Sequence, residues 1–257
     1  MSKELYCGID LGSSRAKLVL LDDKKEILGF SVLKSGSNFK DTAQRALDIV
    51  LKDIGSVQSE IKSTVSCGYG RENVEFADGH KTELGCHAKG SYHYFPFAIN
   101  VIDIGGQDNK IIKINKEGKR TSFKMNRKCA AGTGAFLEEM AMRLEVELSD
   151  MNEIAKTAKG IVTIGSYCTV FSATEVLEHI RHGEKVEDLI KGLFTSVIKR
   201  ILEMDSFEDQ IVMSGGVVEH NPLIAEIISA QTGTDILTAE HPQLTGAVGA
   251  ALYAMEL

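Results

Sequence analysis

Two short stretches of the sequence place one aspartate inside an apolar run and end that run with glycine. They are Ile9-Asp10-Leu11-Gly12 and Ile102-Asp103-Ile104-Gly105. A carboxylate in such a run costs several kcal/mol unless it is paired, hydrated or bound to a metal, so each aspartate is expected to line a site. Glycine lets the chain turn tightly and brings backbone N–H groups close to an anion. Both stretches are therefore typical of strands that lead into anion-binding turns.

The two stretches repeat at the same register. A lysine follows each aspartate by seven residues, Lys17 after Asp10 and Lys110 after Asp103, and each lysine leads into another apolar run. Two copies of a strand–acid–glycine–strand unit indicate an internal duplication, with two similar domains that face each other. One aspartate from each half would then meet across a cleft. Each lysine could contact a phosphate or could simply mark the start of a strand.

A third glycine-containing segment, the pair Gly215-Gly216, follows the apolar run at 211–214. Two acid-bearing turns and this strand–Gly–Gly segment together predict ATP binding, with turn amides on the phosphates and the last glycine pair against the adenosine. The two aspartates would organise Mg²⁺ through its waters, because Mg²⁺ dehydrates reluctantly. One of the aspartates, or Gln107, could orient the attacking water. The sequence has no P-loop motif, which excludes that class of nucleotide site.

Two of the five cysteines, Cys129 and Cys168, each come just before the start of a predicted helix, where thiolate charge is favoured. A lone cysteine in such a place is usually an inert buried thiol, but two in matching settings favour metal or redox chemistry. Two thiolates cannot saturate zinc or an iron–sulfur cluster that requires four ligands, whereas a twofold dimer brings four to its axis. Structural roles are expected for the remaining cysteines, Cys7, Cys67 and Cys86, and for the neighbouring His87.

The candidate site residues fall into three groups. The catalytic candidates are Asp10, Asp103 and Gln107. The candidates for cofactor binding are Gly12, Ser13, Ser14, Lys17, Gly105, Gly106, Gly132, Thr133, Gly134, Gly215, Gly216, Val217 and Asn221. The candidate metal ligands are Cys129 and Cys168.

Composition narrows the class of protein. The 257 residues are 43% hydrophobic and 25% charged, with a net charge of −7, so no basic field would attract nucleic acid. No apolar run approaches the roughly 20 residues that a membrane span requires. Residues 1–5 lack the apolar core of a signal peptide. A cytoplasmic location is expected, where cysteines are thiols or metal ligands rather than structural disulfides.

The elements that must position these residues alternate between strands and helices. Helices are expected at Phe39–Ile54, Glu83–Tyr92, Ala135–Leu148, Val186–Met204 and about 246–257. Two more helix starts carry local signals: Ser172 with Glu175 fits a capping box, and Asn221 with Pro222 offers a cap and a proline at the first helical position. We expect a first domain at 1–95, with helix 246–257 packing back on it, and a second at 96–245.

Three segments resemble a known superfamily, the actin-like, sugar-kinase and Hsp70 ATPases. Gly8–Ser14 resembles its first phosphate segment, Ile102–Gly106 its second, and Met213–Val217 its adenosine segment. The resemblance implies an α/β fold of two RNase-H-like domains with a nucleotide cleft between them.

The cysteine segments resemble a narrower family. Cys129-Ala130-Ala131-Gly132-Thr133-Gly134 and Ser166-Tyr167-Cys168-Thr169-Val170-Phe171 are similar to those of the ATP-dependent activators of 2-hydroxyacyl-CoA dehydratases and the ATPase subunits of benzoyl-CoA reductases. The resemblance implies a homodimer that bridges one oxygen-sensitive [4Fe–4S] cluster through both cysteines of each subunit. ATP hydrolysis would drive a low-potential electron into a dehydratase or related reductase, with a ferredoxin or flavodoxin upstream.

The sequence departs from the family pattern at two positions, and two rival functions stay open. Ala173 stands where relatives commonly have glutamate, and Asn109 stands where serine is frequent. A small-molecule kinase of the same fold would have no use for paired cysteines at helix starts. An ATP-gated interaction module would not need them either. Iron bound to protein that was purified without oxygen would distinguish the electron-transfer function from both the kinase and the interaction module.

Overall fold

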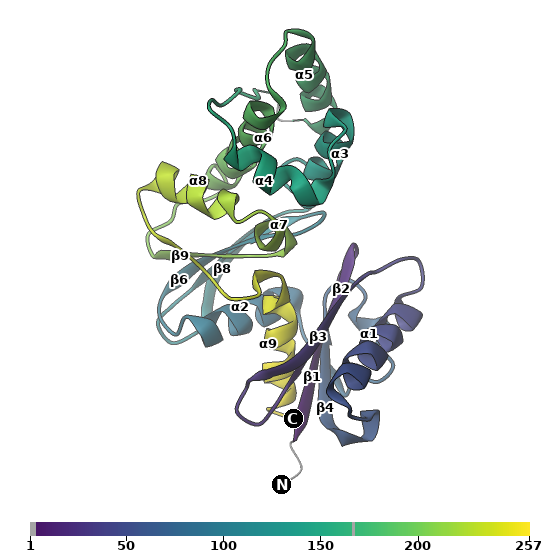
Figure 1. The fold of residues 1–257 in the computed structure, drawn as a ribbon. Coiled ribbons are helices and arrows are strands. Elements are labelled where there is room, and N and C mark those ends of the chain that lie inside the picture. The colour runs from purple at the N-terminus through teal and green to yellow at the C-terminus, as the bar shows by residue number, and fades with distance from the viewer. Residues whose placement is uncertain (1–3, 166–167) are drawn as a thin grey trace. The chain divides into compact units, whose positions relative to one another are not determined.

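The computed structural model describes residues 4–165 and 168–257, so Ser166 and Tyr167 of the second cysteine segment lie outside the described residues. The chain forms two compact units (Figure 1). Unit 1 comprises the described residues up to Ile99, with Ile114–Thr121 and Gln243–Leu257, and unit 2 comprises Asn100–Lys113 and Ser122–Pro242. Each unit is built around one five-stranded sheet.

The unit 1 sheet has the strand order β3-β2-β1-β4-β5. The strands are β1 (Leu5–Leu11), β2 (Arg15–Leu21), β3 (Ile27–Lys34), β4 (Ile61–Cys67) and β5 (Gly79–His80). β1 pairs antiparallel with β2 and parallel with β4. Every residue of β1 is buried because helices cover both faces of the sheet. The apolar run that the sequence marked as a strand is therefore the centre of the sheet.

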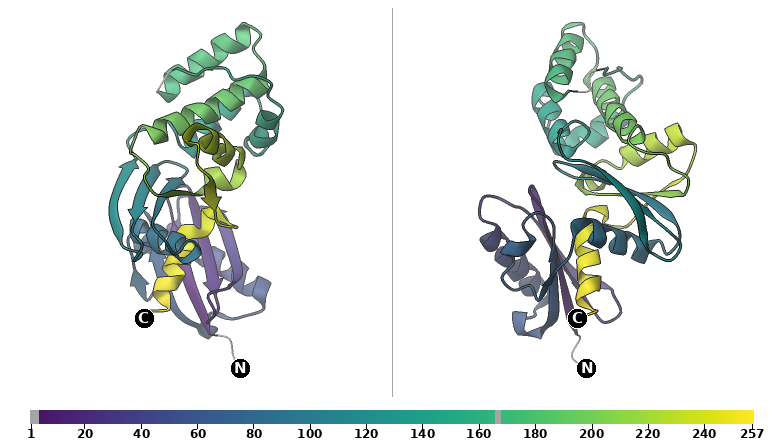
Figure 2. Two further views of the ribbon diagram at one scale, coloured as in Figure 1. Left: turned by 90° about the vertical axis from the view of Figure 1, so that its left-hand side faces the viewer. Right: turned by 180° about the vertical axis from the view of Figure 1, so that it is seen from behind.

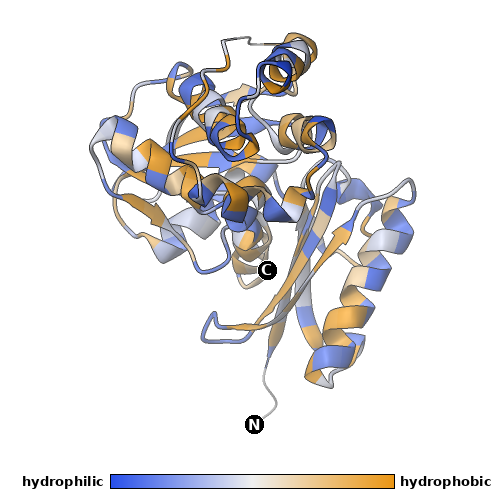
Figure 3. Cartoon of the chain, turned by 45° about the horizontal axis from the view of Figure 1, so that its top comes forward, coloured by the Kyte–Doolittle hydropathy of each residue, from blue (hydrophilic) through white to orange (hydrophobic). Residues whose placement is uncertain are grey.

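Three helices cover this sheet: α1 (Phe39–Ile54), α2 (Glu83–Tyr94) and α9 (Thr245–Ala254). α1 begins where the Asn38 side chain accepts a hydrogen bond from the Asp41 N–H, and it ends at Gly55 in the left-handed region. Its apolar stripe is buried against the sheet, as the periodicity predicted (Figure 3). α9 packs along β1 and β4 (Figure 2).

Glycines allow α9 to contact its neighbours backbone to backbone. A Cβ added at Gly249 would lie 1.8 Å from the Cys86 carbonyl oxygen of α2, and one at Gly8 would lie 2.1 Å from the Ala247 carbonyl oxygen. We expect Gly249→Ala to lower the free energy of unfolding by roughly 3 kcal/mol or more, at the top of the range for overpacking. Urea denaturation followed by circular dichroism measures the change.

Gly79→Ala is the matched control for that substitution, because its added Cβ would meet atoms no closer than 3.7 Å. The control is expected to keep the denaturation midpoint of the parent. Equal midpoints for Gly249→Ala and Gly79→Ala would contradict the close packing of α2 and α9.

The unit 2 sheet has the order β10-β9-β6-β7-β8. Its strands are β6 (Ile99–Ile104), β7 (Asn109–Ile114), β8 (Arg120–Asn126), β9 (Gln210–Ser214) and β10 (Ile236–Thr238). Read from β8 to β10, the sheet repeats the strand order of unit 1. In each sheet, three strands that are consecutive in sequence lie side by side, and the next two strands follow at least one helix later in the chain. The matching order agrees with the internal duplication that the aspartate–glycine units indicated.

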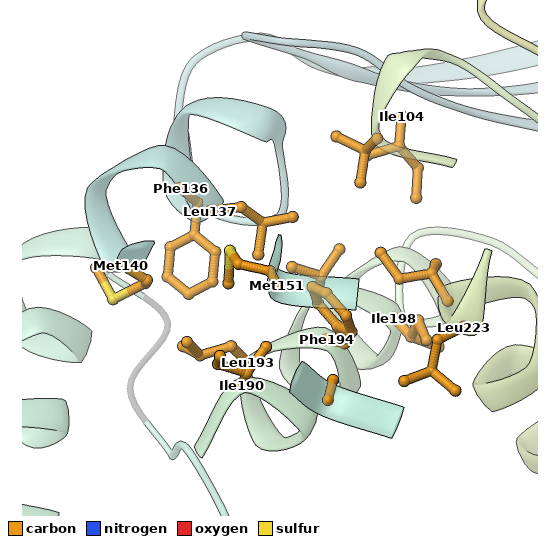
Figure 4. Packing of buried hydrophobic residues seen from close by; sticks show 14 of the residues in the cluster. Ile104, Phe136, Leu137, Met140, Met151, Ile190, Leu193, Phe194, Ile198 and Leu223 are labelled. Carbon is orange, nitrogen blue, oxygen red and sulfur yellow. The ribbon is translucent and has the colours of Figure 1, made fainter. Parts of the chain in front are cut away.

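Unit 2 carries six α-helices in its described residues. They are α3 (Gly134–Leu144), α4 (Met151–Lys156), α5 (Thr169–Arg181), α6 (Val186–Leu202), α7 (Gly216–His220) and α8 (Leu223–Thr232). Figure 4 shows Phe136 and Met140 of α3 meeting Leu193 and Phe194 of α6 in the core. Among the described residues, no helix is both long and apolar enough to cross a membrane.

Two predicted helix starts were wrong. α5 begins at Thr169, because the Ser172 N–H already donates to the Cys168 carbonyl oxygen at 2.8 Å, as in a helix interior. Glu175 accepts from the Gly165 N–H at 2.7 Å, so no capping box forms. The N-cap of α8 is Pro222, and Asn221 Oδ1, which would have to accept in a cap, has no hydrogen-bond partner, while the Asn221 amide donates to the Val217 carbonyl oxygen.

The β7–β8 turn groups with unit 1, whereas the sequence-based division placed it in the second domain. The Tyr92 hydroxyl of α2 donates to the Lys116 carbonyl oxygen at 2.6 Å. Gly118, with φ +76°, lies against the Tyr92 ring, where a Cβ would come within 2.8 Å of a ring carbon. These two contacts attach the turn to α2.

Candidate functional site

The first candidate site lies at the end of β1, in unit 1. Asp10 is buried opposite Lys17 in the β1–β2 pair, and the Lys17 ammonium lies 3.0 Å from Asp10 Oδ2. The turn that follows is closed by the Gly12 N–H, which donates to the Arg15 carbonyl oxygen at 3.1 Å. Because the Lys17 side chain keeps 19% exposure, it can reach solvent beside the turn while it pairs with Asp10.

Two glycines and a histidine surround Asp10. A Cβ at Gly68 would lie 2.5 Å from Asp10 Oδ1, and Gly68 also has φ +87°, so both space and conformation require glycine there. A Cβ at Gly246 would lie 2.9 Å from His87 Nε2 and 3.2 Å from Asp10 Oδ2, so these side chains meet beside Gly246. His87 therefore belongs to the site. No spacing in the sequence marks it, because only the packing of α2 and α9 brings it to Asp10.

The second candidate site lies at the end of β6, in unit 2, and its Asp103 and Lys110 side chains are buried. The Lys110 ammonium lies 3.2 Å from Asp103 Oδ2 and 2.9 Å from Asp108 Oδ1. The Ser214 hydroxyl of β9 donates to Asp103 Oδ1 at 2.9 Å. Both oxygens of Asp103 are thus held. The Lys110 side chain is only 2% exposed between two carboxylates, so its position is that of a stabilising counter-ion.

The turn after Asp103 repeats the geometry of the first. The Gly105 N–H donates to the Asp108 carbonyl oxygen at 2.9 Å, as Gly12 does to Arg15. Gly106 and Gln107 at its tip are exposed. Each unit therefore has a tight turn with an exposed tip, and the aspartate at the base of the turn is paired with a lysine. Such a turn can offer backbone N–H groups to a phosphate.

The third predicted segment begins where β9 ends. Gly215 has φ +99°, and a Cβ there would lie 2.3 Å from the Ile104 carbonyl oxygen of β6, so glycine is required. A Cβ at Gly216 would meet no atom within 4 Å. Val217 and Asn221 are buried behind it. Gly216 is therefore the residue of this segment that has open space beside it, as a nucleoside would need.

The two candidate metal ligands are exposed, and both lie in unit 2. Cys129 lies in the loop between β8 and α3, and Cys168 is the N-cap of α5. α3 and α5 border one open cavity of about 450 Å³, which is lined from Ala135 to Arg143 and from Thr169 to Leu177. Within residues 4–165 and 168–257, no three His, Cys, Asp or Glu side chains gather as a metal site. One chain thus offers two thiols near the starts of two neighbouring helices.

The segment after Cys129 is compact. The Thr133 N–H and hydroxyl both donate to the Ala130 carbonyl oxygen. Gly132 has φ +85°, and Gly134 is the first residue of α3. The Gly134 N–H donates to the Gly105 carbonyl oxygen of the second turn at 2.9 Å. These three predicted cofactor-binding residues therefore connect the cysteine loop to the second turn.

The remaining cysteines are buried thiols. Burial raises the pKa of the Cys7 thiol to about 12. A hydrogen bond with Cys86 and burial raise the pKa of the Cys67 thiol. A thiol that stays protonated is a poor nucleophile, so the raised pKa of Cys7 and Cys67 lowers their reactivity further, whereas Cys86 is shielded by its burial.

We therefore expect two of the five thiols, Cys129 and Cys168, to react rapidly with a disulfide reagent in the folded, metal-free protein. The count is read from the fast phase of absorbance at mildly alkaline pH. Protein unfolded in guanidinium is the control, and all five should react there. A third fast thiol in the folded chain would contradict the burial of Cys7, Cys67 and Cys86.

The chain matches the family model described as the BadF/BadG/BcrA/BcrD ATPase family over residues 7–254. It is 42% identical over 252 residues to an activator of lactoyl-CoA dehydratase from Anaerotignum propionicum, covering 97% of this chain and 96% of that protein.

Two solved structures share the fold closely. The activator of 2-hydroxyisocaproyl-CoA dehydratase from Clostridium difficile, with bound ADPNP, has a TM-score of 0.92 and 38% identity, covering 98% of this chain and 94% of that one. Component A of (R)-2-hydroxyglutaryl-CoA dehydratase from Acidaminococcus fermentans has a TM-score of 0.93 and 38% identity, covering 98% of both chains.

These matches extend over nearly the whole chain and confirm the resemblance found in the sequence. The α/β fold of the actin-like ATPases is confirmed as well, by the two sheets of matching strand order and by the structural neighbours. The chain belongs to the BadF/BadG/BcrA/BcrD ATPase family.

Proposed function

We propose that this ATPase is an ATP-driven electron donor that activates a partner, a 2-hydroxyacyl-CoA dehydratase or a related cluster-bearing reductase. The observation that carries the proposal is the pair of exposed thiols, Cys129 and Cys168, near the starts of two neighbouring helices. A small-molecule kinase needs no such pair. Relatives that are activators of 2-hydroxyacyl-CoA dehydratases support the same function.

ATP binds through the two acid–glycine turns. The Gly12 and Gly105 N–H groups close the turns, so the backbone N–H groups at 13–14 and 106–107 hold the phosphates, and the open face at Gly216 receives the adenosine. Asp10 and Asp103 already contact Lys17 and Lys110, so they fit a Mg²⁺ ion that keeps its own waters rather than one that they ligate directly. One of the aspartates, or Gln107, orients the water that attacks the terminal phosphate.

The donor set fits a cluster shared between two copies of the chain. Each chain supplies two thiolates, Cys129 and Cys168, and a [4Fe–4S] cluster takes four, so a twofold homodimer completes the set. Held by these thiolates, such a cluster would supply one-electron transfer at low potential between a ferredoxin or flavodoxin and the partner. The start of α5, whose N-cap is Cys168, would favour negative charge there.

Protein purified without oxygen tests the proposal. We expect a dimer that contains about four iron atoms per two chains, with acid-labile sulfide in equal amount. The reduced dimer should activate a dehydratase only when Mg–ATP is added. A chain that hydrolyses ATP but never contains iron would contradict the proposal and would leave a kinase or an ATP-gated interaction module as its function.

A further inference from the structure

The cysteine loop is hydrogen-bonded directly to the second turn of unit 2. The Gly134 N–H donates to the Gly105 carbonyl oxygen at 2.9 Å, and the Ala135 N–H donates to the Gly106 carbonyl oxygen at 2.7 Å. These two donors belong to the first turn of α3, where N–H groups have no partner inside the helix. The second turn therefore supplies the acceptors that complete the start of α3.

The contact is close as well as polar. A Cβ at Gly134 would lie 3.2 Å from Gly106 Cα and 3.4 Å from the Gly105 carbonyl oxygen. The first residue of α3 thus rests on the turn backbone, with no side chain between them. A shift of the turn by about 1 Å would lengthen these bonds beyond hydrogen-bond range unless the start of α3 moved with the turn.

One side chain extends this connection toward the metal ligand. Asn109, the first residue of β7, is only 2% exposed, and its amide donates to the Gly132 carbonyl oxygen at 3.2 Å. Gly132 lies three residues after Cys129, inside the loop that Asn126 also holds by donating to the Cys129 carbonyl oxygen at 3.2 Å. Asn109 thus joins the strand that leaves the turn to the loop that carries the thiol.

The far side of the loop is closed by α6. Arg200 lies against the loop, with its Cδ 3.8 Å from where a Cβ at Gly132 would be, and its guanidinium lies 4.9 Å from the centre of the Phe136 ring. The Gly132 end of the loop is thus held between β7 and α6. Movement of the turn can therefore reach this end of the loop.

We infer that Asn109 is a positioning residue that transmits nucleotide occupancy of the Gly105–Gly106 turn to the position of Cys129. The inference rests on the proposed function, in which this turn holds phosphate and Cys129 binds the cluster. A nucleotide shifts the loop between two conformations only if its binding free energy differs between them. The hydrogen bonds at 105, 106 and 109 supply that difference, because they join the turn that holds phosphate to the loop.

The test reads the reactivity of one thiol in the metal-free chain. In a Cys168→Ser background, Cys129 is the one cysteine left on the exposed surface of the described residues. We expect Mg–ADPNP to change the alkylation rate of Cys129 about fivefold or more, the lower end of typical couplings between sites. Asn109→Ala is expected to bring the ratio of the two rates close to one while ADPNP still binds, as measured by calorimetry.

A matched control exists on the neighbouring strand. Asn100 of β6 is 1% exposed, and its amide likewise donates to a loop carbonyl oxygen, that of Asp209, at 2.9 Å. Asn100→Ala therefore removes an equivalent buried amide away from the cysteine loop and should keep the ADPNP effect. Asn109→Leu, of similar size and without the amide, serves if Asn109→Ala does not fold, and it should lose the effect.

The outcomes separate the two proposals. Failure of the parent chain to bind ADPNP would overturn the proposed function and this inference with it. Binding without any change in the Cys129 rate would overturn the inference alone. The inference would also fall if Asn109→Ala and Asn109→Leu kept the parent ratio, or if Asn100→Ala lost it as well.

Discussion

Cys129→Ser should yield a protein that binds and hydrolyses ATP but holds no iron. A serine hydroxyl is a poor ligand for iron in such a cluster, and in a twofold dimer one substitution removes two of four sulfur ligands. The parent should contain about four iron atoms per two chains and the variant almost none. Elemental analysis and the visible absorption of protein purified without oxygen measure the difference. ATP-dependent activation of a dehydratase should be lost in parallel.

Cys7→Ala is the control for this substitution. It also removes a thiol, but one that is buried in β1, far from any exposed surface. It should retain both iron and activation. A Cys129→Ser variant with parental iron content would exclude this residue as a ligand, and loss of ATP binding in the same variant would point to a folding defect instead.

Asp103→Asn is expected to slow ATP hydrolysis by about 10²–10³-fold, the scale seen when one preorganised electrostatic group is removed from an active site. The amide keeps the shape of the carboxylate and can still accept from Ser214, but it lacks the charge that would hold the hydrated Mg²⁺. Turnover is measured by phosphate release under saturating Mg–ATP. The fall should appear mainly in kcat.

Asp108→Asn is the matched control, because Asp103 and Asp108 share the same lysine. Either substitution leaves Lys110 with one carboxylate, so the net charge of the buried group is the same in both variants. Only Asp103 is proposed to organise Mg²⁺, and we expect Asp108→Asn to lose less than about tenfold, within what a partner at a solvated position contributes. Equal losses would show that the charge balance at Lys110 matters and that Asp103 has no special role.

The roles of the two lysines, which the sequence left open, differ in the structure. Both follow an aspartate by seven residues, and both pair with it across a hairpin. Lys17 retains access to solvent beside the first turn, whereas Lys110 is enclosed by Asp103 and Asp108. Lys17 thus stays a candidate phosphate ligand, and Lys110 is a counter-ion.

Local patterns in the sequence determined much about this protein. The two aspartate–glycine stretches, their repeat and the helix at Phe39–Ile54 depend on alternation and periodicity, which express the burial of one strand or one helix face. The cysteine segments and the glycine pairs led to the correct family. The prediction failed where it relied on a local hydrogen bond. The capping box at Ser172 did not form, because the helix begins three residues earlier, at Thr169.

The tertiary structure decided what the pattern-bearing residues contact. Ser214 reaches Asp103 from 111 residues away, His87 meets Asp10 only because α2 and α9 pack on β1, and the start of α3 rests on the turn at Gly105. Each of these contacts joins segments that are distant in the chain. No local propensity encodes such contacts, because they form only when two surfaces of complementary shape are packed together.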